Sequence, residues 1–355
     1  MELTLINNGI GYTGYGIPVY TQNLYDNLIK YGVEAEKVNL FDYIGSGNLK
    51  IKGRTVHISG IRAFKKQLFL LSGAKPLINK NIHVMSPEIL PYSIIRKARA
   101  KIITVHDFYF FTPDFQRGHL SGFHGIQKFF HTQAMKTSIN RWKYVPLYDK
   151  IFAVSEETKN GLIGRFDIDS SKISVAYPII PDRFKPLDIE KKSVIGYINN
   201  FNFNKREKLK VFIEAFKKIK DSDLEFHIYG KNFPFADLIK DNERIKYLGF
   251  LSEDKIVETI NSFSAYLSTS TMEGFGIPIM QAKACKIPVL CYDSEIPNIT
   301  KRNTLLWNEE NIQSILESRE WEKVDVEKAY LDAEECRADK VIPKMLKVYS
   351  EVFKW

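Results

Sequence analysis

The sequence predicts an α/β protein of two domains, each a parallel β-sheet covered by helices. Short apolar runs alternate with helical patterns from end to end, which is typical of parallel sheets. A length of 355 residues is typical of two domains, and an apolar content of 44% suffices for two buried cores. The two halves are therefore expected to be two separate Rossmann-like domains.

Nine apolar runs are predicted to be strands, in two series. The first series is 3–7, 82–85, 101–106 and 150–154. The second series is 193–198, 225–229, 245–248, 265–268 and 287–291. Residues 177–186 between the series contain three prolines, which predicts an interdomain connection.

Composition agrees with an ordinary enzyme of the cytoplasm. No run reaches the roughly 18 apolar residues of a membrane span, and the N-terminus has a strand pattern without a signal peptide. The three cysteines have neither metal-ligand nor disulfide spacing, so buried thiols are expected. A net charge of +9 favours anionic partners: a nucleotide diphosphate, a phosphate-bearing lipid, an acidic glycan or nucleic acid.

The most informative segment is residues 271–290, which places Glu273 beside a glycine-bracketed helix start. Pro278 suits the first turn of a helix, so Glu273 to Gly276 is expected to be a strand-to-helix turn. The N–H groups of Phe275, Gly276 and Ile277, at the expected helix start, can face an anion or sugar hydroxyls. A carboxylate there can bind hydroxyls or stabilise a developing positive centre, or it can simply cap the helix.

This segment resembles the carboxylate motif of the retaining nucleotide-sugar glycosyltransferases of family four, also called group one. The motif has two glutamates with seven residues between them. Glu273 matches the first, which the resemblance places at the donor sugar. Gln281 stands where the family usually has the second, a glutamate that holds the ribose. An amide still donates and accepts hydrogen bonds but lacks a carboxylate's charge, so a weaker ribose contact is expected.

Other segments match the same family in the same order, so the resemblance covers most of the chain. They are 151–158, 172–175, 182–186, 212–216, 226–230 and 247–250. The resemblance implies the GT-B fold, with two Rossmann-like domains whose parallel sheets face a central cleft. It implies an acceptor-side domain over 1–186, a nucleotide-sugar-binding domain over 187–340, and a final helix over 341–355 that packs back on the first domain.

The family also uses a cationic pair for the donor diphosphate, because the leaving nucleotide gains negative charge in the transition state. The pair is expected before the helix at 212–216. Arg206 and Lys208 are assigned to it, with Lys205 as the substitute, because the usual lysine position falls on or beside Glu207. A solvated charge run is the alternative. With these cations no divalent metal and no cofactor are required.

A glycine cluster after the first strand, residues 8–16, can bring N–H groups against a phosphate. The resemblance to the glycosyltransferase family implies that Gly14 and Gly16 contact the donor phosphates or the acceptor. The cluster also satisfies a dinucleotide fingerprint, with Glu34 at a tolerable distance for a ribose acid, and a simple tight turn is a third interpretation.

His106 ends a predicted parallel strand, and ligands bind in open sheets outside such carboxyl ends. It matches a family histidine that approaches the transferred sugar, so it is assigned to orienting the donor sugar. The alternative is a histidine satisfied by a neighbouring loop.

The implied reaction is retaining transfer of a hexose from a UDP- or GDP-linked donor to a hydroxyl of a glycan, lipid-linked or protein acceptor. The acceptor proton passes to the departing phosphate, so the protein needs no separate base. Aromatic and basic residues in 108–113 and 119–142 suit an acceptor. Residues 61–71 have one apolar helical face that suits either a membrane surface, at the inner face of the membrane, or the core.

Two rival functions come from other classes. A catalytically silent glycan or nucleic-acid binding protein on the same fold is favoured by Gln281 and the basic charge, although nucleic acid is not the expected partner. An NAD-dependent oxidoreductase built on the glycine cluster leaves the Glu273 motif unexplained. A metal site of His119, His124 and His131 is not expected, because their spacing fits no familiar ligand pattern.

Overall fold

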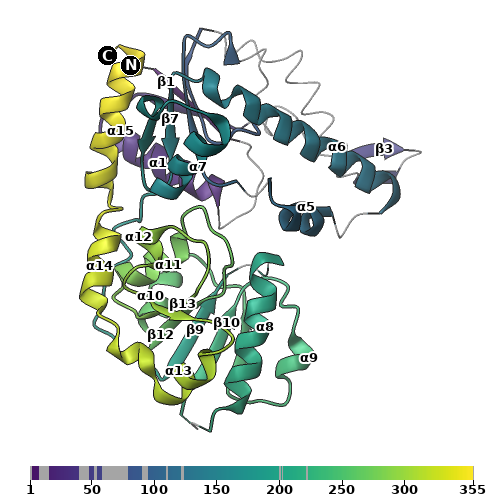
Figure 1. Cartoon of the computed structure of the whole chain (residues 1–355), viewed down its shortest axis with the longest axis vertical. Helices are drawn as coiled ribbons and strands as arrows, with labels where there is room; N and C mark the ends of the chain where they lie inside the picture. Colours follow the sequence, from purple (N-terminus) through teal and green to yellow (C-terminus); the bar gives the residue numbers. More distant parts are fainter. Residues whose placement is uncertain are drawn as a thin grey trace. The chain divides into compact units, whose positions relative to one another are not determined.

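The computed structural model describes residues 2–7, 16–39, 48–51, 54–57, 79–89, 95–108, 111–120, 124–199, 201, 203–220 and 223–354. The chain divides into two compact units (Figure 1). The first unit contains Met1–Ile179 and Val341–Trp355, and the second contains Ile180–Lys340. The last segment of the chain thus belongs to the first unit.

The division falls at residue 179, seven residues before the expected boundary at 186. The reason lies in hydrogen bonds at the start of the second unit. The backbone N–H of Ile180 donates to the carbonyl of Cys336 at 2.9 Å. The guanidinium of Arg337 donates to the carbonyls of Pro181 and Phe184 at 2.9 and 2.8 Å. Residues 180–186 of the proline-rich connection therefore belong to the second unit.

The first unit has a six-stranded sheet in the order β2-β1-β5-β6-β7-β8, and every neighbouring pair is parallel. Its strands are β1 (Leu3–Asn7), β2 (Ala35–Asn39), β5 (Asn81–Val84), β6 (Ala100–Val105), β7 (Lys150–Ala153) and β8 (Ile173–Val175). Strands β3 (Asn48–Ile51) and β4 (Arg54–His57) form a separate antiparallel pair. Parallel strands need crossover connections, which helices provide here.

The helices described in the first unit lie between its consecutive strands in the chain, except α15, which comes after the second unit. They are α1 (Ile17–Lys30), α5 (Pro113–Leu120), α6 (Gly125–Arg141), η3 (Trp142–Leu147), α7 (Glu156–Phe166), η4 (Ser170–Lys172) and α15 (Ala338–Phe353). Ser155 caps α7, because its Oγ accepts from the N–H of Thr158 at 3.1 Å. In Figure 1, α6 extends away from the sheet of its own unit.

The second unit repeats the architecture with a parallel sheet in the order β11-β10-β9-β12-β13-β14. Its strands are β9 (Val194–Ile198), β10 (Glu225–Tyr229), β11 (Ile245–Gly249), β12 (Ala265–Ser268), β13 (Val289–Tyr292) and β14 (Leu305–Trp307). Its helices are α8 (Phe203–Lys218), α9 (Ala236–Ile239), α10 (Ile256–Asn261), α11 (Ile277–Ala284), α12 (Asn298–Lys301), α13 (Ile312–Ser318), η5 (Glu320–Lys323) and α14 (Val326–Glu334). The two sheets confirm the expected Rossmann-like fold class.

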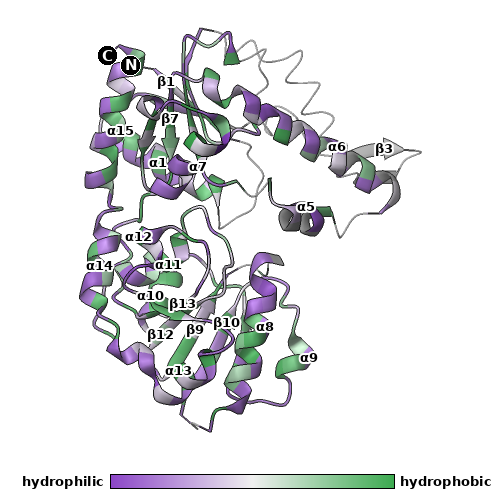
Figure 2. Cartoon of the chain, viewed as in Figure 1, coloured by the Kyte–Doolittle hydropathy of each residue, from purple (hydrophilic) through white to green (hydrophobic). Residues whose placement is uncertain are grey.

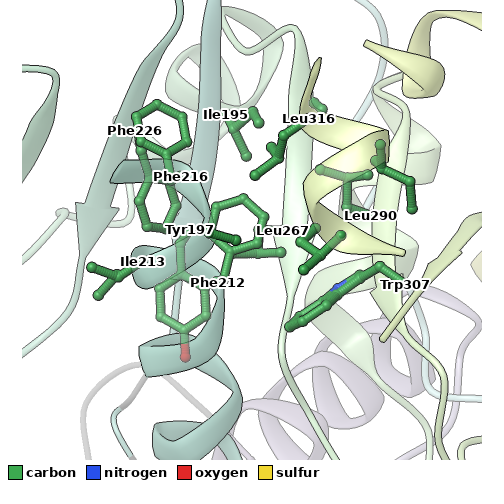
Figure 3. Close-up of a cluster of buried hydrophobic side chains, with 14 of the residues drawn as sticks. Ile195, Tyr197, Phe212, Ile213, Phe216, Phe226, Leu267, Leu290, Trp307 and Leu316 are labelled. Atoms are coloured by element: carbon green, nitrogen blue, oxygen red, sulfur yellow. The ribbon is translucent and has the colours of Figure 1, made fainter. Parts of the chain in front are cut away.

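One face of α8 forms the core of the second unit, as Figure 3 shows. Phe212, Ile213 and Phe216 are fully buried against Phe226 of β10 and Leu267 of β12. Figure 2 shows the complementary pattern, with hydrophilic residues along the outer sides of the helices. Burying aromatic side chains of this size contributes about 1.5–3 kcal/mol each. This packing holds α8 rigidly beside the carboxyl ends of the strands.

Helix α15 joins the first unit through a buried polar chain. The hydroxyl of Tyr349 lies 2.7 Å from Nδ1 of His83 on β5, and Nε2 of His83 lies 2.8 Å from Oγ1 of Thr104 on β6. Burial lowers the pKa of His83 to about 3, so this ring is neutral at pH 7. The final helix is thus fixed to two central strands of the first sheet.

Candidate functional site

Glu273 lies in the turn between β12 and α11, as expected from the sequence. Two groups hold its carboxylate. The hydroxyl of Ser270 donates to Oε1 at 2.7 Å, and Nζ of Lys205 lies 2.8 Å from the same oxygen. The side chains of Lys205 and Glu273 are 10% and 19% exposed, so the ion pair is largely shielded but reachable from solvent. The carboxylate is therefore fixed in place by its neighbours.

Lys205 connects three elements at one edge of the sheet. It stands in the first turn of α8, and its Nζ also donates to Oδ1 of Asn199 at 3.0 Å. Asn199 follows β9, and Glu273 follows β12, which is the neighbour of β9 in the sheet. Both strands thus present their carboxyl ends here, which is the edge where open parallel sheets bind ligands.

The start of α8 and the Glu273 turn are also joined through their backbones. The carbonyl of Asn204 accepts from the N–H of Thr271 at 3.1 Å and from its hydroxyl at 3.0 Å. The side-chain amide of Asn204 donates to the carbonyl of Met272 at 3.2 Å, and the hydroxyl of Thr269 donates to that of Lys205 at 3.1 Å. The site is therefore preorganised by contacts around the ion pair.

Gly276 begins α11 in a backbone conformation that requires glycine. Its φ is +94°, and a Cβ atom there would lie 2.8 Å from Cγ2 of Thr300. Thr300, on α12, is buried and donates from Oγ1 to the carbonyl of Phe275. Among the described residues, none accepts a hydrogen bond from the backbone N–H of Gly276 or Ile277. These amides and the helix dipole make the turn suitable for an anion.

The remaining predicted residues of α11 lie around this start. Phe275 is buried, so its ring packs inside the protein while its backbone forms the turn. Ile277 and Gln281 are half-buried and four positions apart, which places them on one face of the helix. In the described part of the chain, no group hydrogen-bonds to the side-chain amide of Gln281. The amide is therefore available to a ligand.

The two predicted cations have other neighbours. Arg206 is exposed, and its guanidinium lies 5.9 Å from the ring centre of Phe235. Lys208 pairs with Glu309 and lies 4.7 Å from the ring centre of Tyr292. The substitute named from the sequence, Lys205, is the cation that contacts Glu273.

Helical spacing is the signal that separates Lys205 from its neighbours. Lys205, Leu209, Phe212 and Phe216 recur at three- to four-residue intervals and are all buried. Lys205 thus begins the apolar face of α8, whereas Arg206 is exposed one position further on. Ser270, Asn199 and Thr300 were not singled out by the sequence, because single small polar residues carry no distinctive pattern.

His106 belongs to the first unit and follows β6, as expected. Its Nε2 lies 3.0 Å from the carbonyl of Met85, and its ring meets the Tyr20 ring edge to face at 4.8 Å. Because a carbonyl only accepts, Nε2 carries the proton and Nδ1 keeps its lone pair. Burial lowers the pKa of His106 to about 4, so the ring is neutral at pH 7. Nδ1 can then accept a hydrogen bond from a hydroxyl.

Of the glycine cluster, the structure describes Gly16 alone. Gly16 begins α1 with φ +86°. Gly14 and the other glycines of the dinucleotide fingerprint lie outside the described residues, as does the 61–71 segment. Within the described ranges, no three His, Cys, Asp or Glu residues form a group suited to a metal ion. None of the helices described is long and apolar enough to cross a membrane.

Comparison with known proteins identifies the relatives of this arrangement. Residues 179–317 match the family model of the glycosyl transferases group 1. The chain is 24% identical over 149 residues to the poly(ribitol-phosphate) alpha-N-acetylglucosaminyltransferase of Staphylococcus aureus, covering 40% of this chain and 29% of that one. It is 29% identical over 203 residues to the O-antigen chain mannosyltransferase RfbU of Salmonella typhimurium, covering 55% and 52%. The chain thus spans about half or less of these relatives.

Solved structures show the same fold along nearly the whole chain. The crystal structure of TarM has a TM-score of 0.70 at 12% identity and covers 98% of both chains. The pneumococcal O-GlcNAc transferase GtfA, solved with UDP and GlcNAc, has a TM-score of 0.70 at 13% identity and covers 99% of both. The expected GT-B fold class and the expected resemblance to group 1 are confirmed.

Proposed function

We propose that this chain, whose residues 179–317 match the family model of the glycosyl transferases group 1, moves a hexose from a nucleotide-diphosphate sugar to an acceptor hydroxyl. The observation that carries the proposal is the Glu273 carboxylate, held by Lys205 and Ser270 at the carboxyl edge of the second sheet. The backbone amides of Gly276 and Ile277 stand beside it. One place therefore offers a fixed negative charge to a sugar and positive groups to a phosphate.

The donor is proposed to be UDP- or GDP-linked. GtfA was solved with UDP and GlcNAc, and a TarM variant was solved with UDP, which supports a nucleotide donor on this fold. The side-chain amide of Gln281 is proposed to hold the ribose hydroxyls, as a donor and an acceptor without charge. Its half-buried position, one helical turn after Ile277 on the same face of α11, supports that role.

Lys205 is proposed as the main cation for the donor diphosphate. Its second acceptor, Asn199, is neutral, so the lysine can exchange this bond for a phosphate oxygen while it keeps Glu273. Arg206 and Lys208 remain predicted donor contacts. Lys208 must first leave Glu309 to reach a phosphate, and Arg206 must leave the ring of Phe235.

The proposed reaction retains the configuration at the anomeric carbon. The bond between that carbon and the diphosphate oxygen breaks, and the acceptor oxygen forms its bond on the same face. The acceptor proton moves to the departing phosphate. Glu273 stabilises the positive charge on the sugar ring, and Lys205 with the α11 amides stabilises the leaving group, so the proposal requires no divalent metal. Neutral His106 is proposed to orient the donor sugar through Nδ1.

The acceptor is proposed to be a glycan, a lipid-linked glycan or a protein. The names of two relatives support a polymeric acceptor, because one name includes poly(ribitol-phosphate) and the other includes an O-antigen chain. The second candidate function is a catalytically silent binder on the same fold. It is favoured by Gln281 in place of the family's usual glutamate.

The test is nucleotide release from a panel of UDP-, GDP- and ADP-sugars without acceptor. We expect one donor to be hydrolysed, and Glu273→Gln to slow its release about 100- to 1000-fold, because a charge aimed at the transition state is lost. Lys205→Gln should raise the donor KM and lower kcat, with Lys210→Gln as the matched control at an exposed position of α8. A Glu273→Gln protein with full activity would overturn the assignment, and donor binding without release would favour the silent binder.

A further inference from the structure

The two units carry opposite charge. The first unit contains 26 Lys and Arg against 14 Asp and Glu, a net charge of +12. The second unit, which carries the proposed donor site, contains 25 against 28, a net charge of −3. The basic character of the chain therefore resides in the first unit, and a nucleotide donor bound by the second unit does not account for it.

The positive charge is concentrated in one part of the first unit. Residues 43–148 contain 17 Lys and Arg against three acidic residues, and residues 115–148 contain no acidic residue at all. This second stretch includes α6 and η3. A protein surface that lacks acidic residues over such a length attracts polyanions and repels cations at distances up to the Debye length, about 8–10 Å at physiological salt.

The basic residues of α6 and η3 form an exposed stripe. Phe129, Gln133, Lys136, Asn140 and Lys143 are exposed and recur at intervals of three and four residues, which places them on one side of the helix. Lys128, beside Phe129, is also exposed. In the described part of the chain, no carboxylate pairs with the three lysines of this stripe. Their charges are therefore available to a partner.

The C-terminal end of α6 is anchored beside the edge of the first sheet where His106 lies. At the end of α6, Arg141 donates to the carbonyls of Glu88 and Ile89, and the indole of Trp142 donates to the Glu88 carboxylate at 2.9 Å. This loop follows β5, and its Met85 carbonyl accepts from His106. The stripe thus begins beside the loop that positions His106 and runs outward along α6.

The composition of the stripe distinguishes a polyanion from a lipid surface. A helix that lies in a membrane interface needs a broad apolar face beneath its basic residues. Among the described residues of α6 and η3, the exposed large apolar ones are Phe129 and Leu147, at the two ends of the stripe. Amides and lysines lie between them, and Figure 2 shows hydrophilic residues along much of α6. Charge and hydrogen bonding, rather than burial of apolar area, must therefore supply the affinity.

We infer that this basic stripe, Lys128, Lys136 and Lys143 with the polar residues between them, binds a linear phosphate-bearing acceptor chain and leads it to the reaction edge of the first unit. The inference rests on the proposed function, which it deepens by naming the acceptor as a phosphodiester-linked polymer. Repeated phosphates along a chain match lysines spaced along a helix, and the exposed amides hydrogen-bond to hydroxyls between the phosphates.

The experiment measures binding of the full chain to long-chain inorganic polyphosphate, without donor, over a series of salt concentrations. The variant is Lys128→Gln, Lys136→Gln and Lys143→Gln together. The matched control is Arg96→Gln, Lys97→Gln and Arg99→Gln, which removes the same charge from exposed residues before β6, at the opposite end of the strand from His106. Neutral dextran and vesicles with anionic lipid are the comparison ligands.

We expect the stripe variant to weaken polyphosphate binding about tenfold, from a few-fold per exposed lysine, and the salt dependence to fall by up to about one unit of slope per lysine. The control should change affinity by less than about twofold. Equal losses in both variants, or no loss in either, would overturn the inference, and so would binding to anionic vesicles but not to polyphosphate. Because no donor is present, polyphosphate binding by a protein that releases no nucleotide would refute the proposed function alone.

Discussion

A buried ion pair between α11 and α14 allows a stringent test of how the Glu273 turn is supported. Nζ of Lys283 is fully buried and lies 3.0 Å from the Asp332 carboxylate, and it also donates to the carbonyls of Ile299 and Arg302 at 3.1 and 2.7 Å. These carbonyls belong to α12 and the residue after it, which places Thr300 over the turn. The Lys283–Asp332 ion pair thus fixes α12, and α12 in turn supports the Glu273 turn through Thr300.

The two partners are not equally replaceable. Asp332 keeps the Arg302 guanidinium at 2.6 Å and the Asn303 amide at 3.0 Å when Lys283 is lost. Lys283 keeps only carbonyls when Asp332 is lost. At 3.0 Å the attraction is worth about 5.5 kcal/mol at an effective dielectric constant of about 20, and it offsets the desolvation of the ammonium. Burial already lowers the pKa of Lys283.

Asp332→Asn is therefore expected to destabilise the second unit by about 3–5 kcal/mol at pH 7, since it leaves a buried charge without its partner. Lys283→Met should cost less, and the double variant should be more stable than Asp332→Asn alone. The loss of folding stability in Asp332→Asn should become smaller as pH rises toward 10. The unfolded chain, with a lysine pKa near 10.4, binds a proton that the buried lysine of the variant resists, and this advantage of the unfolded state declines with rising pH.

Hydrogen exchange of peptides from α11 and α14 measures the local unfolding free energy within the second unit. Wild type, both single variants and the double variant form the cycle, and each is measured at pH 7 and pH 9. The reasoning is refuted if Asp332→Asn costs under about 1 kcal/mol, or if the two single effects simply add.

Two further outcomes follow from the site and the first sheet. Gly276→Ala should reduce donor turnover more than tenfold, and should lower stability by about 1–3 kcal/mol, because a positive φ and a close approach to Thr300 leave no room for a methyl group; turnover and thermal unfolding check both, and unchanged kinetics would contradict the geometry. Stability of the first unit should fall as pH drops from about 6.5 toward 3, by up to about 1.4 kcal/mol per pH unit. The reason is that the pKa of His83 is about 3 in the folded chain and near 6.5 in the unfolded chain. The stability of His83→Gln should fall less steeply with pH in acid unfolding, and an identical slope would contradict the assignment.

The strands that were predicted lie in stretches of four to six residues rich in apolar side chains, which burial in a parallel sheet favours. The edge strand β2 was missed, since its residues Ala35–Asn39 alternate with charged side chains. The edge strands β8 and β14 were also missed, because each has three residues, and the antiparallel pair β3 and β4 was not predicted. Strand β13 begins at Val289, two residues later than expected, because Lys286 has a positive φ and Pro288 has no N–H to donate.

The site was predictable where a backbone requirement leaves a mark in the sequence. Gly276 and Pro278 indicate the turn that carries Glu273, and the structure places the turn there. The contact between Lys205 and Glu273 joins residues 68 positions apart, and only the pairing of β9 with β12 brings them together. Helical spacing places Lys205 on the buried face of α8, but no local pattern specifies the strand pairing, so its contact with Glu273 is known only from the structure.

The final helix has a consequence for the order in which the chain is completed. Because Val341–Trp355 belongs to the first unit, the whole second unit is an insertion within the first, with its own two ends tied by the bond between Ile180 and Cys336. The first unit can finish folding only after every residue of the second has left the ribosome, while the second can close earlier. Because its two ends lie close together, the second unit can be replaced by that of a similar protein at two junctions in the chain, without changing the sheet of the first unit.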